Sequence, residues 1–162
     1  MPQMISCRDT QRMKEQFEKH PLTAWVKISE DGTITICNPA AEMGQGSMTS
    51  LPVVFAEEMD ADWSRVAVEF SPQEAEVYGS PGWTPGSKLM MTVGSRTTKS
   101  YWLVMRNAGA QARYVLIYSA ASYWEVPVGE VSTSAGSVIH EQSGREMAYG
   151  ALVPHLQMPE VL

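Results

Sequence analysis

The sequence contains few of the residues that define several common protein classes. Its 162 residues include two cysteines, Cys7 and Cys37, without a CxxC spacing, so neither a disulfide scaffold nor a cysteine-rich metal site is expected. Acidic residues outnumber basic ones by 18 to 12, and this balance leaves no basic face for nucleic acid. Apolar runs long enough for a membrane span or a secretory signal are also missing. We therefore expect a cytoplasmic protein.

Histidine is also scarce. His20, His140 and His155 lie far apart in the sequence without i, i+4 partners, so a protein-ligated metal site is not expected and all three are interpreted as surface residues. The serines and cysteines have no recognisable base and orienting partner, which a nucleophilic triad requires. The sequence therefore predicts neither a catalytic residue nor a direct metal ligand in this chain.

The chain divides into a short leader and one domain. Residues 1–20 carry many charges, and Met13 and Phe17 have the spacing of a short helix, although the segment also fits a disordered leader. Residues 21–162 have the length of a single domain with one hydrophobic core.

Alternating apolar residues predict the strands of this domain. Residues 24–28 and 33–36 form two extended runs, and the Asp31-Gly32 dipeptide between them favours a tight hairpin. A third strand is predicted at residues 66–70, and a second hairpin is predicted around residues 140–144. These runs indicate a sheet built largely from neighbouring segments.

Two helices are predicted between the strands. The first begins between residues 47 and 50, where hydroxyl side chains can cap free amides, and Pro52 is acceptable only within its first turn. The second follows residue 98 and ends near Trp124, and small residues around Gly109 let it approach a neighbouring element closely. Trp102 and Trp124 are expected in the core, and the Pro- and Gly-rich stretch 71–88 is expected to be a long loop.

The order of elements predicts an α+β fold with a mixed β-sheet and two main helices packed on it. A Rossmann fold is not expected, because Thr49 occupies the third glycine position of the GxGxxG fingerprint.

Met43-Gly44-Gln45-Gly46 is the first candidate binding motif. The two glycines permit close backbone approach, and the helix that follows offers free N–H groups with a partial positive charge. Gln45 adds an amide that can donate and accept hydrogen bonds, which suits the edge of a heterocycle. The same glycines also fit a strand-to-helix turn with no ligand, and the sequence pattern alone favours that interpretation.

A second candidate motif lies at the start of the second helix. Hydroxyl groups surround a glycine and a basic residue there, a composition that can hold a phosphate; the candidates are Thr92, Gly94, Ser95, Arg96 and Thr97. A polar loop that only caps the helix fits the composition equally well. Two such helix starts can serve one extended anionic ligand if the fold brings them together.

Several segments within about residues 21–152 carry a resemblance to known proteins: 23–28, 31–36, 41–46, 56–63, 108–113, 120–126, 136–140, 143–145 and 149–150. Together they resemble the large subunits of isoquinoline oxidoreductase and its aldehyde-oxidising relatives, a branch of the xanthine dehydrogenase and aldehyde oxidase superfamily of molybdenum hydroxylases. The resemblance implies a molybdopterin-cofactor-binding domain.

The resemblance also assigns roles to the two motifs. It implies that Met43, Gly44, Gln45 and Gly46 lie near the pterin and the metal. It further implies that the second loop receives the cofactor phosphate through Thr92, Gly94, Ser95 and Thr97, with Arg96 contributing less because its side chain can point away. Bacterial members of this superfamily usually carry the cytosine dinucleotide form of the cofactor, and the cofactor supplies the difficult chemistry.

The sequence also departs from the superfamily pattern. Neither the Phe-Gly-Gly type motif nor the glutamate that acts as general base is found, so the chain is expected to be incomplete as a hydroxylase of N-heteroaromatics or aldehydes. The resemblance implies two partners: the remainder of the molybdenum-binding subunit and a small subunit with 2Fe-2S clusters. The alternative is a non-catalytic binding or assembly module, which could form a homo-oligomer through a large exposed apolar patch.

Overall fold

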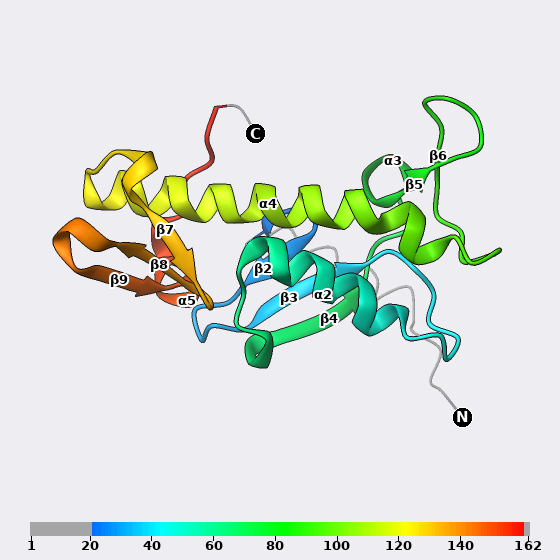
Figure 1. Ribbon diagram of the computed structural model, residues 1–162, viewed down its shortest axis with the longest axis horizontal. Coiled ribbons are helices and arrows are strands. Elements are labelled where there is room, and N and C mark those ends of the chain that lie inside the picture. The colour runs from blue at the N-terminus through cyan, green and yellow to red at the C-terminus, as the bar shows by residue number, and fades with distance from the viewer. Residues whose placement is uncertain (1–20, 161–162) are drawn as a thin grey trace.

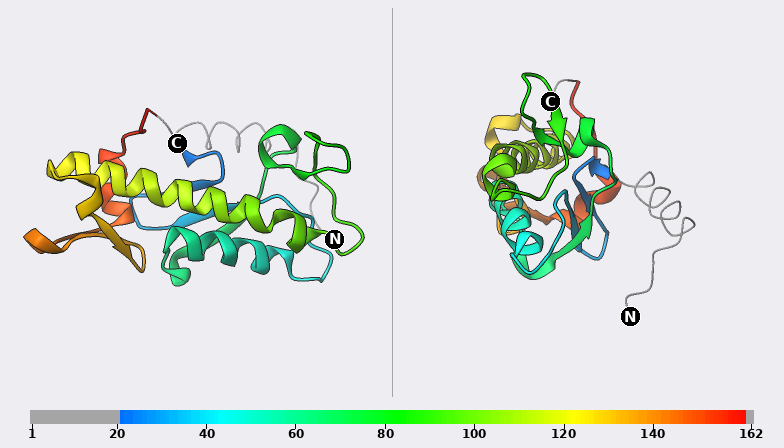
Figure 2. Two further views of the ribbon diagram at one scale, coloured as in Figure 1. Left: turned by 45° about the horizontal axis from the view of Figure 1, so that its top comes forward. Right: turned by 90° about the vertical axis from the view of Figure 1, so that its right-hand side faces the viewer.

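The structure, a computed structural model, describes residues 21–160, and the predicted leader helix lies outside them. The fold is elongated, and a long helix, α4 (Thr97–Trp124), runs along its length with the sheets packed beside it (Figures 1 and 2). No helix within the described residues is long and apolar enough to cross a membrane.

A four-stranded mixed sheet lies beside the helices. Its strands are β1 (Pro21–Thr23), β2 (Val26–Ile28), β3 (Ile34–Asn38) and β4 (Val66–Phe70), in that spatial order. β2 and β3 form the hairpin that the Asp31-Gly32 turn predicts, and β4 pairs in parallel with β3. The parallel pair requires a crossover, and the first main helix supplies it.

The two main helices run side by side, and both begin at the same end of the molecule (Figures 1 and 2). They are α2 (Ser47–Met59) and α4 (Thr97–Trp124), which confirms both predicted helices. Their close approach depends on Gly109, where an added Cβ would lie 2.5 Å from the carbonyl oxygen of Phe55. Pro52 is the sixth residue of α2, so the prediction that it lies in the first turn is wrong.

The stretch 71–88 is not a structureless loop, contrary to the sequence prediction. It contains the short helix α3 (Ala75–Tyr78), and β5 (Ser80–Pro81) pairs with β6 (Lys88–Leu89) to form a hairpin. This hairpin projects beside the N-terminal end of α4 (Figure 1). Short runs of two to four residues carry too little periodicity to be recognised from sequence.

A third sheet lies beside the C-terminal half of α4. It contains β7 (Ser132–Ser134), β8 (Ser137–His140) and β9 (Arg145–Ala148), and the β8–β9 hairpin confirms the second predicted hairpin. The helix α5 (Tyr149–Leu152) follows it. Four 3₁₀ turns complete the described chain: Trp63–Arg65, Val128–Glu130, Glu141–Ser143 and Val153–His155. The predicted α+β class is confirmed, but the strands form three sheets rather than one.

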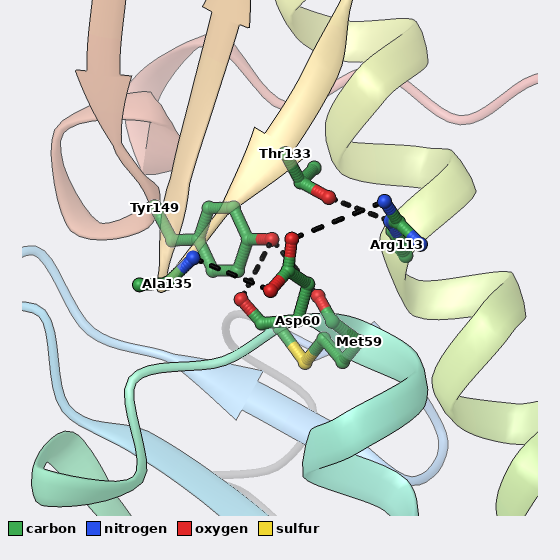
Figure 3. A network of polar contacts seen from close by, with 6 residues as sticks. All are labelled: Met59, Asp60, Arg113, Thr133, Ala135 and Tyr149. Atoms are coloured by element: carbon green, nitrogen blue, oxygen red, sulfur yellow. Dashed lines mark hydrogen bonds and ion pairs between the residues drawn. The ribbon is translucent and has the colours of Figure 1, made fainter.

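A network of polar contacts connects this third sheet to both main helices (Figure 3). The hydroxyl of Tyr149 donates to the carbonyl of Met59 at the end of α2, at 2.8 Å. Arg113 of α4 donates to the Thr133 hydroxyl at 2.6 Å and lies 3.9 Å from the Asp60 carboxylate. Tyr149 is almost completely buried, and this burial raises the pKa of its hydroxyl. The network fixes the third sheet against the ends of the helices.

Three aromatic or histidine predictions have different outcomes. Trp124 is buried, as predicted. Trp102 is 45% exposed, so its predicted core position is wrong. Tyr101, one residue earlier on α4, is fully buried in the hydrophobic core instead. His140 is not a surface residue, because only 4% of it is exposed and its ring bonds Glu130 at 3.0 Å.

Candidate functional site

The loop between β3 and α2 is organised by the carboxylate of Glu42. This carboxylate accepts hydrogen bonds from the backbone N–H groups of Gly44, Gly46 and Met48, at 2.7, 3.0 and 2.9 Å. Hydrogen bonds from these N–H groups, with Met48 contributing most, lower the pKa of Glu42 to about 2. The predicted hydroxyl cap is therefore wrong, since the N-cap residue is Gly46 and the side chain that serves the free amides is Glu42.

The amide of Gln45 also belongs to this loop. Its Oε1 accepts a hydrogen bond from the Met43 N–H at 2.6 Å, and its Nε2 donates to the Ala41 carbonyl at 2.7 Å and to the Ser47 hydroxyl at 3.1 Å. Both N–H bonds of the amide are thus used inside the loop, and Oε1 retains a second lone pair. Gln45 consequently holds the loop in shape.

The outer side of the first loop is open. Gly44 and Gly46 have φ values of 95° and 82°, which favour glycine, and a Cβ at either position would meet no atom within 4 Å. Met43 is 70% exposed beside them. The loop therefore presents a shallow backbone surface that a flat ligand can approach.

The second candidate loop precedes α4. Gly94 and Ser95 are consecutive residues in the left-handed region, with φ values of 59° and 54°. The helix begins at Thr97, and its N-cap residue Arg96 makes no side-chain cap. In contrast to the first loop, no carboxylate within residues 21–160 accepts a hydrogen bond from the free amides at the start of this helix.

The structure brings the two loops together. The hydroxyl of Thr92, in the second loop, accepts a hydrogen bond from the Ala41 N–H of the first loop at 3.0 Å. The two helices that follow these loops start at the same end of the molecule (Figure 1). The sequence motifs, about 50 residues apart, therefore form one surface.

Arg96 points away from this surface, as its intervening position in the motif suggested. Its Nη2 donates to the carbonyl of Pro81 at 3.0 Å, and its guanidinium lies 5.1 Å from the centre of the Trp83 ring. Arg96 thus connects the second loop to the β5–β6 hairpin.

Two polar residues of the site were missed by the sequence reasoning. Glu42 precedes the first glycine by two residues, and this spacing was the available signal for a carboxylate on the loop amides. Asn38, the last residue of β3, is 1% exposed and donates to the carbonyl of Ala40, while its Oδ1 has no partner among the described residues. Nothing in the sequence indicates that the side-chain oxygen of Asn38 is buried.

Hollows of measurable volume lie away from the two loops. A groove of about 490 Å³ runs between α4 and the β5–β6 hairpin, and a second cavity of about 330 Å³ lies between the β2–β3 turn and α5. Neither is lined by a residue of the two predicted motifs. No cluster of three or more potential metal-ligating side chains occurs in the part of the chain that the structure describes.

The first loop should keep its hydrogen bonds to Glu42 at unusually low pH. Because the folded state depresses the pKa of Glu42 from 4.5 to about 2, the stabilisation from its charge is fully present above pH 4.5 and is lost as the pH falls through about 2. Carbon-13 NMR of the Glu42 carboxyl group should therefore show a titration midpoint near pH 2. Glu42→Gln serves as the control, and a wild-type midpoint near 4.5 would contradict the assigned hydrogen bonds.

Comparison with known families identifies the class of this domain. The family described as "Molybdopterin cofactor-binding domain" matches residues 6–160. The chain therefore belongs to the molybdopterin cofactor-binding domain family, which confirms the resemblance found in its motifs.

Curated proteins with similar sequences include enzymes of this kind. The chain is 47% identical to isoquinoline 1-oxidoreductase subunit beta of Brevundimonas diminuta, over 84% of this chain and 17% of that protein. It is 34% identical to a membrane-bound aldehyde dehydrogenase of Gluconacetobacter polyoxogenes, over 81% of this chain and 15% of that protein. The chain thus spans about one sixth of the length of these relatives.

Solved structures confirm the fold. A Cu,Mo-CO dehydrogenase in its carbon monoxide reduced state aligns with a TM-score of 0.59 and 16% identity, over 78% of this chain and 15% of that chain. Quinoline 2-oxidoreductase from Pseudomonas putida 86 aligns with a TM-score of 0.50 and 17% identity, over 79% and 15% of the two chains.

Proposed function

We propose that the chain forms one side of the molybdenum cofactor site of a hydroxylase large subunit. The observation that carries this proposal is the hydrogen bond between Ala41 and Thr92, because it joins the two predicted cofactor loops into one surface. A long ligand can contact both helix starts at once.

The charges of the two loops support a proposal for which loop holds which end of the cofactor. The carboxylate of Glu42 already neutralises the free amides at the start of α2, so a second anion is disfavoured there. The second loop offers hydroxyls and free amides, and no carboxylate of the described residues 21–160 bonds to them. The pterin end is therefore assigned to Met43, Gly44, Gln45 and Gly46, and the phosphate end to Thr92, Gly94, Ser95 and Thr97. Arg96 is proposed as a support rather than a direct ligand.

Open space above the two loops supports this proposal. The space above Gly44, Gly46 and Gly94 is open, since a Cβ at each would meet nothing within 4 Å. When bound, the molybdenum cofactor supplies the redox chemistry of hydroxylation. The residues of this chain bind and orient the cofactor, and we propose the cytosine dinucleotide form.

The remaining parts of the enzyme are proposed as partners. Because the chain spans about one sixth of its relatives, we assign the rest of the molybdenum-binding subunit as its main partner and a 2Fe-2S subunit as the electron acceptor. Apolar side chains available for such contacts include Trp83 and Leu103, which are 70% and 65% exposed. The names of the relatives favour N-heteroaromatic or aldehyde substrates.

Capture of the cofactor tests this function. The full chain, produced together with cofactor maturation proteins, should retain molybdenum and pterin in about equal amounts. Gln45→Ala should retain at least about tenfold less, because the loop loses three internal hydrogen bonds, each of which stabilises it by about 1 kcal/mol.

Gln142→Ala is the matched control, since Gln142 is an exposed glutamine in the 3₁₀ turn before β9. Its pterin and molybdenum content should equal that of the wild type. Two results would favour the non-catalytic binding or assembly module instead. One is a wild-type chain that retains neither molybdenum nor pterin, and the other is equal molybdenum and pterin contents in the wild type, Gln45→Ala and Gln142→Ala.

A further inference from the structure

The outer face of α4 has the residue spacing of a seam between two helices. Its residues follow one another at alternating intervals of four and three positions, as in a coiled coil: Leu103, Asn107, Ala110, Tyr114 and Ile117. Leu103 and Tyr114 are 65% and 42% exposed, Asn107 and Ala110 are also exposed, and Ile117 is half-buried. None of the five carries a charge, although the solvent face of a helix usually does. This seam is therefore suited to contact with another helix.

The seam is complementary to itself when two copies run antiparallel. With Ala110 of one copy opposite Ala110 of the other, residues equally far before and after this position meet across the contact. Leu103 and Ile117 lie seven positions on either side, so two aliphatic side chains pack against each other. The small side chain at the centre permits an axial separation of about 8 Å, the close end of the usual range.

The polar groups of the seam also match in this orientation. Asn107 lies three positions before Ala110, and Tyr114 lies four positions after it, so the two side chains meet between antiparallel copies. Within residues 21–160, neither the Asn107 amide nor the Tyr114 hydroxyl has a hydrogen-bond partner. A two-fold axis forms this hydrogen bond twice, and a polar pair within an apolar seam fixes its register.

The charges at the two ends of α4 favour a second copy as the partner. The helix contains no acidic residue, and Lys99 lies near its start, whereas Glu125 directly follows its end. In the antiparallel pair, Lys99 lies opposite position 121 of the other copy, about 6 Å along the axis from Glu125, which the two long side chains can span. Neither side chain has an ion-pair partner among the described residues. The opposed helix dipoles favour the same orientation.

We propose that two copies of this chain form a two-fold symmetric dimer through the antiparallel seams of α4. The contact between two helices of this length is at the small end of specific interfaces, so a dissociation constant of about 10–100 μM is expected. The seam lies outside both cofactor loops, and the dimer therefore does not depend on the proposed function.

Sedimentation equilibrium of the full chain, from about 1 to 500 μM, tests the dimer. The wild type should change from monomer to dimer over this range. Leu103→Glu should raise the dissociation constant at least about tenfold, because each dimer would bury two carboxylates against Ile117. A monomer at every concentration, or equal constants for Leu103→Glu and the wild type, would overturn the proposal.

Met158→Glu is the matched control for Leu103→Glu. Met158 is 57% exposed, and the preceding residue, Gln157, bonds the fully buried Ser119 of α4, on the side of the helix away from the seam. This variant introduces the same charge as Leu103→Glu and should dimerise like the wild type. An equal loss in both variants would attribute the effect to net charge and reject the seam.

Charge exchange tests the antiparallel orientation. Lys99→Glu should raise the dissociation constant about fivefold, because two exposed ion pairs are replaced by repulsion from Glu125. Lys99→Glu/Glu125→Lys should restore the wild-type constant, since the exchanged charges attract again. No effect of Lys99→Glu, or no recovery in the double variant, would contradict the antiparallel pairing.

Cysteine crosslinking tests the register of the dimer. A short bismaleimide reagent is used in a Cys7→Ser background, and Cys37 can remain because it is buried. Ala110→Cys should yield a covalent dimer, since the two copies of this residue meet at the two-fold axis. Two copies of Lys99→Cys would lie about 33 Å apart along the axis and should not crosslink. Equal crosslinking at both positions, or at neither, would overturn the proposed arrangement.

Discussion

Replacing Gly109 with valine is expected to lower the free energy of unfolding by about 3 kcal/mol. The first added carbon would lie 2.5 Å from the Phe55 carbonyl oxygen and 2.9 Å from the Cβ of Glu58. A backbone carbonyl inside α2 cannot rotate away, so the two helices must separate. This separation would open the core along the contact that joins α2 to α4.

Urea denaturation of Gly109→Val and Ala110→Val measures this effect directly. Ala110 is the next residue of α4 and is exposed, so its replacement should cost only the difference in helix propensity, about 0.5 kcal/mol. Similar losses in the two variants would show that the close helix contact is not what requires glycine at position 109.

Replacing Gly46 with valine is expected to reduce cofactor retention by at least about tenfold while the domain remains folded. Its φ of 82° costs a residue with a side chain roughly 1–2 kcal/mol, which a stable domain tolerates. A Cβ at this position has no protein atom within 4 Å, so the side chain would extend into the open space above the loop. It would therefore obstruct the position assigned to the pterin.

Gly144→Val is the matched control for this experiment. Gly144 has a φ of 67°, also faces open space, and lies in the β8–β9 turn away from both loops. Circular dichroism should show the same folded content for both variants, and metal analysis should show a loss only for Gly46→Val. An equal loss of molybdenum in both would indicate backbone strain rather than obstruction.

Much of the fold could be predicted because it is encoded by local patterns. The Asp31-Gly32 turn joins β2 and β3, and the apolar spacing before Trp124 defines most of α4. The small residue at position 109 also indicated a close helix contact, which the structure shows with α2. In each case, neighbouring residues carried the necessary information.

The remaining features depend on contacts between distant residues. The hydrogen bond from Ala41 to Thr92 spans 51 positions, and no periodicity indicates it. Similarly, Trp102 and Tyr101 are both large aromatics, and only the packing of α4 determines which of them is buried. The division of the strands into three sheets follows from the same long-range packing.

The hydrogen bonds of Glu42 affect how the first loop binds a ligand. Because its carboxylate occupies three amides of the first loop, that loop is already folded before a ligand arrives, and little conformational entropy is lost on association. The same carboxylate repels free inorganic phosphate, which would otherwise compete for the start of α2. The loop is thus preorganised and protected against the small anions of its surroundings.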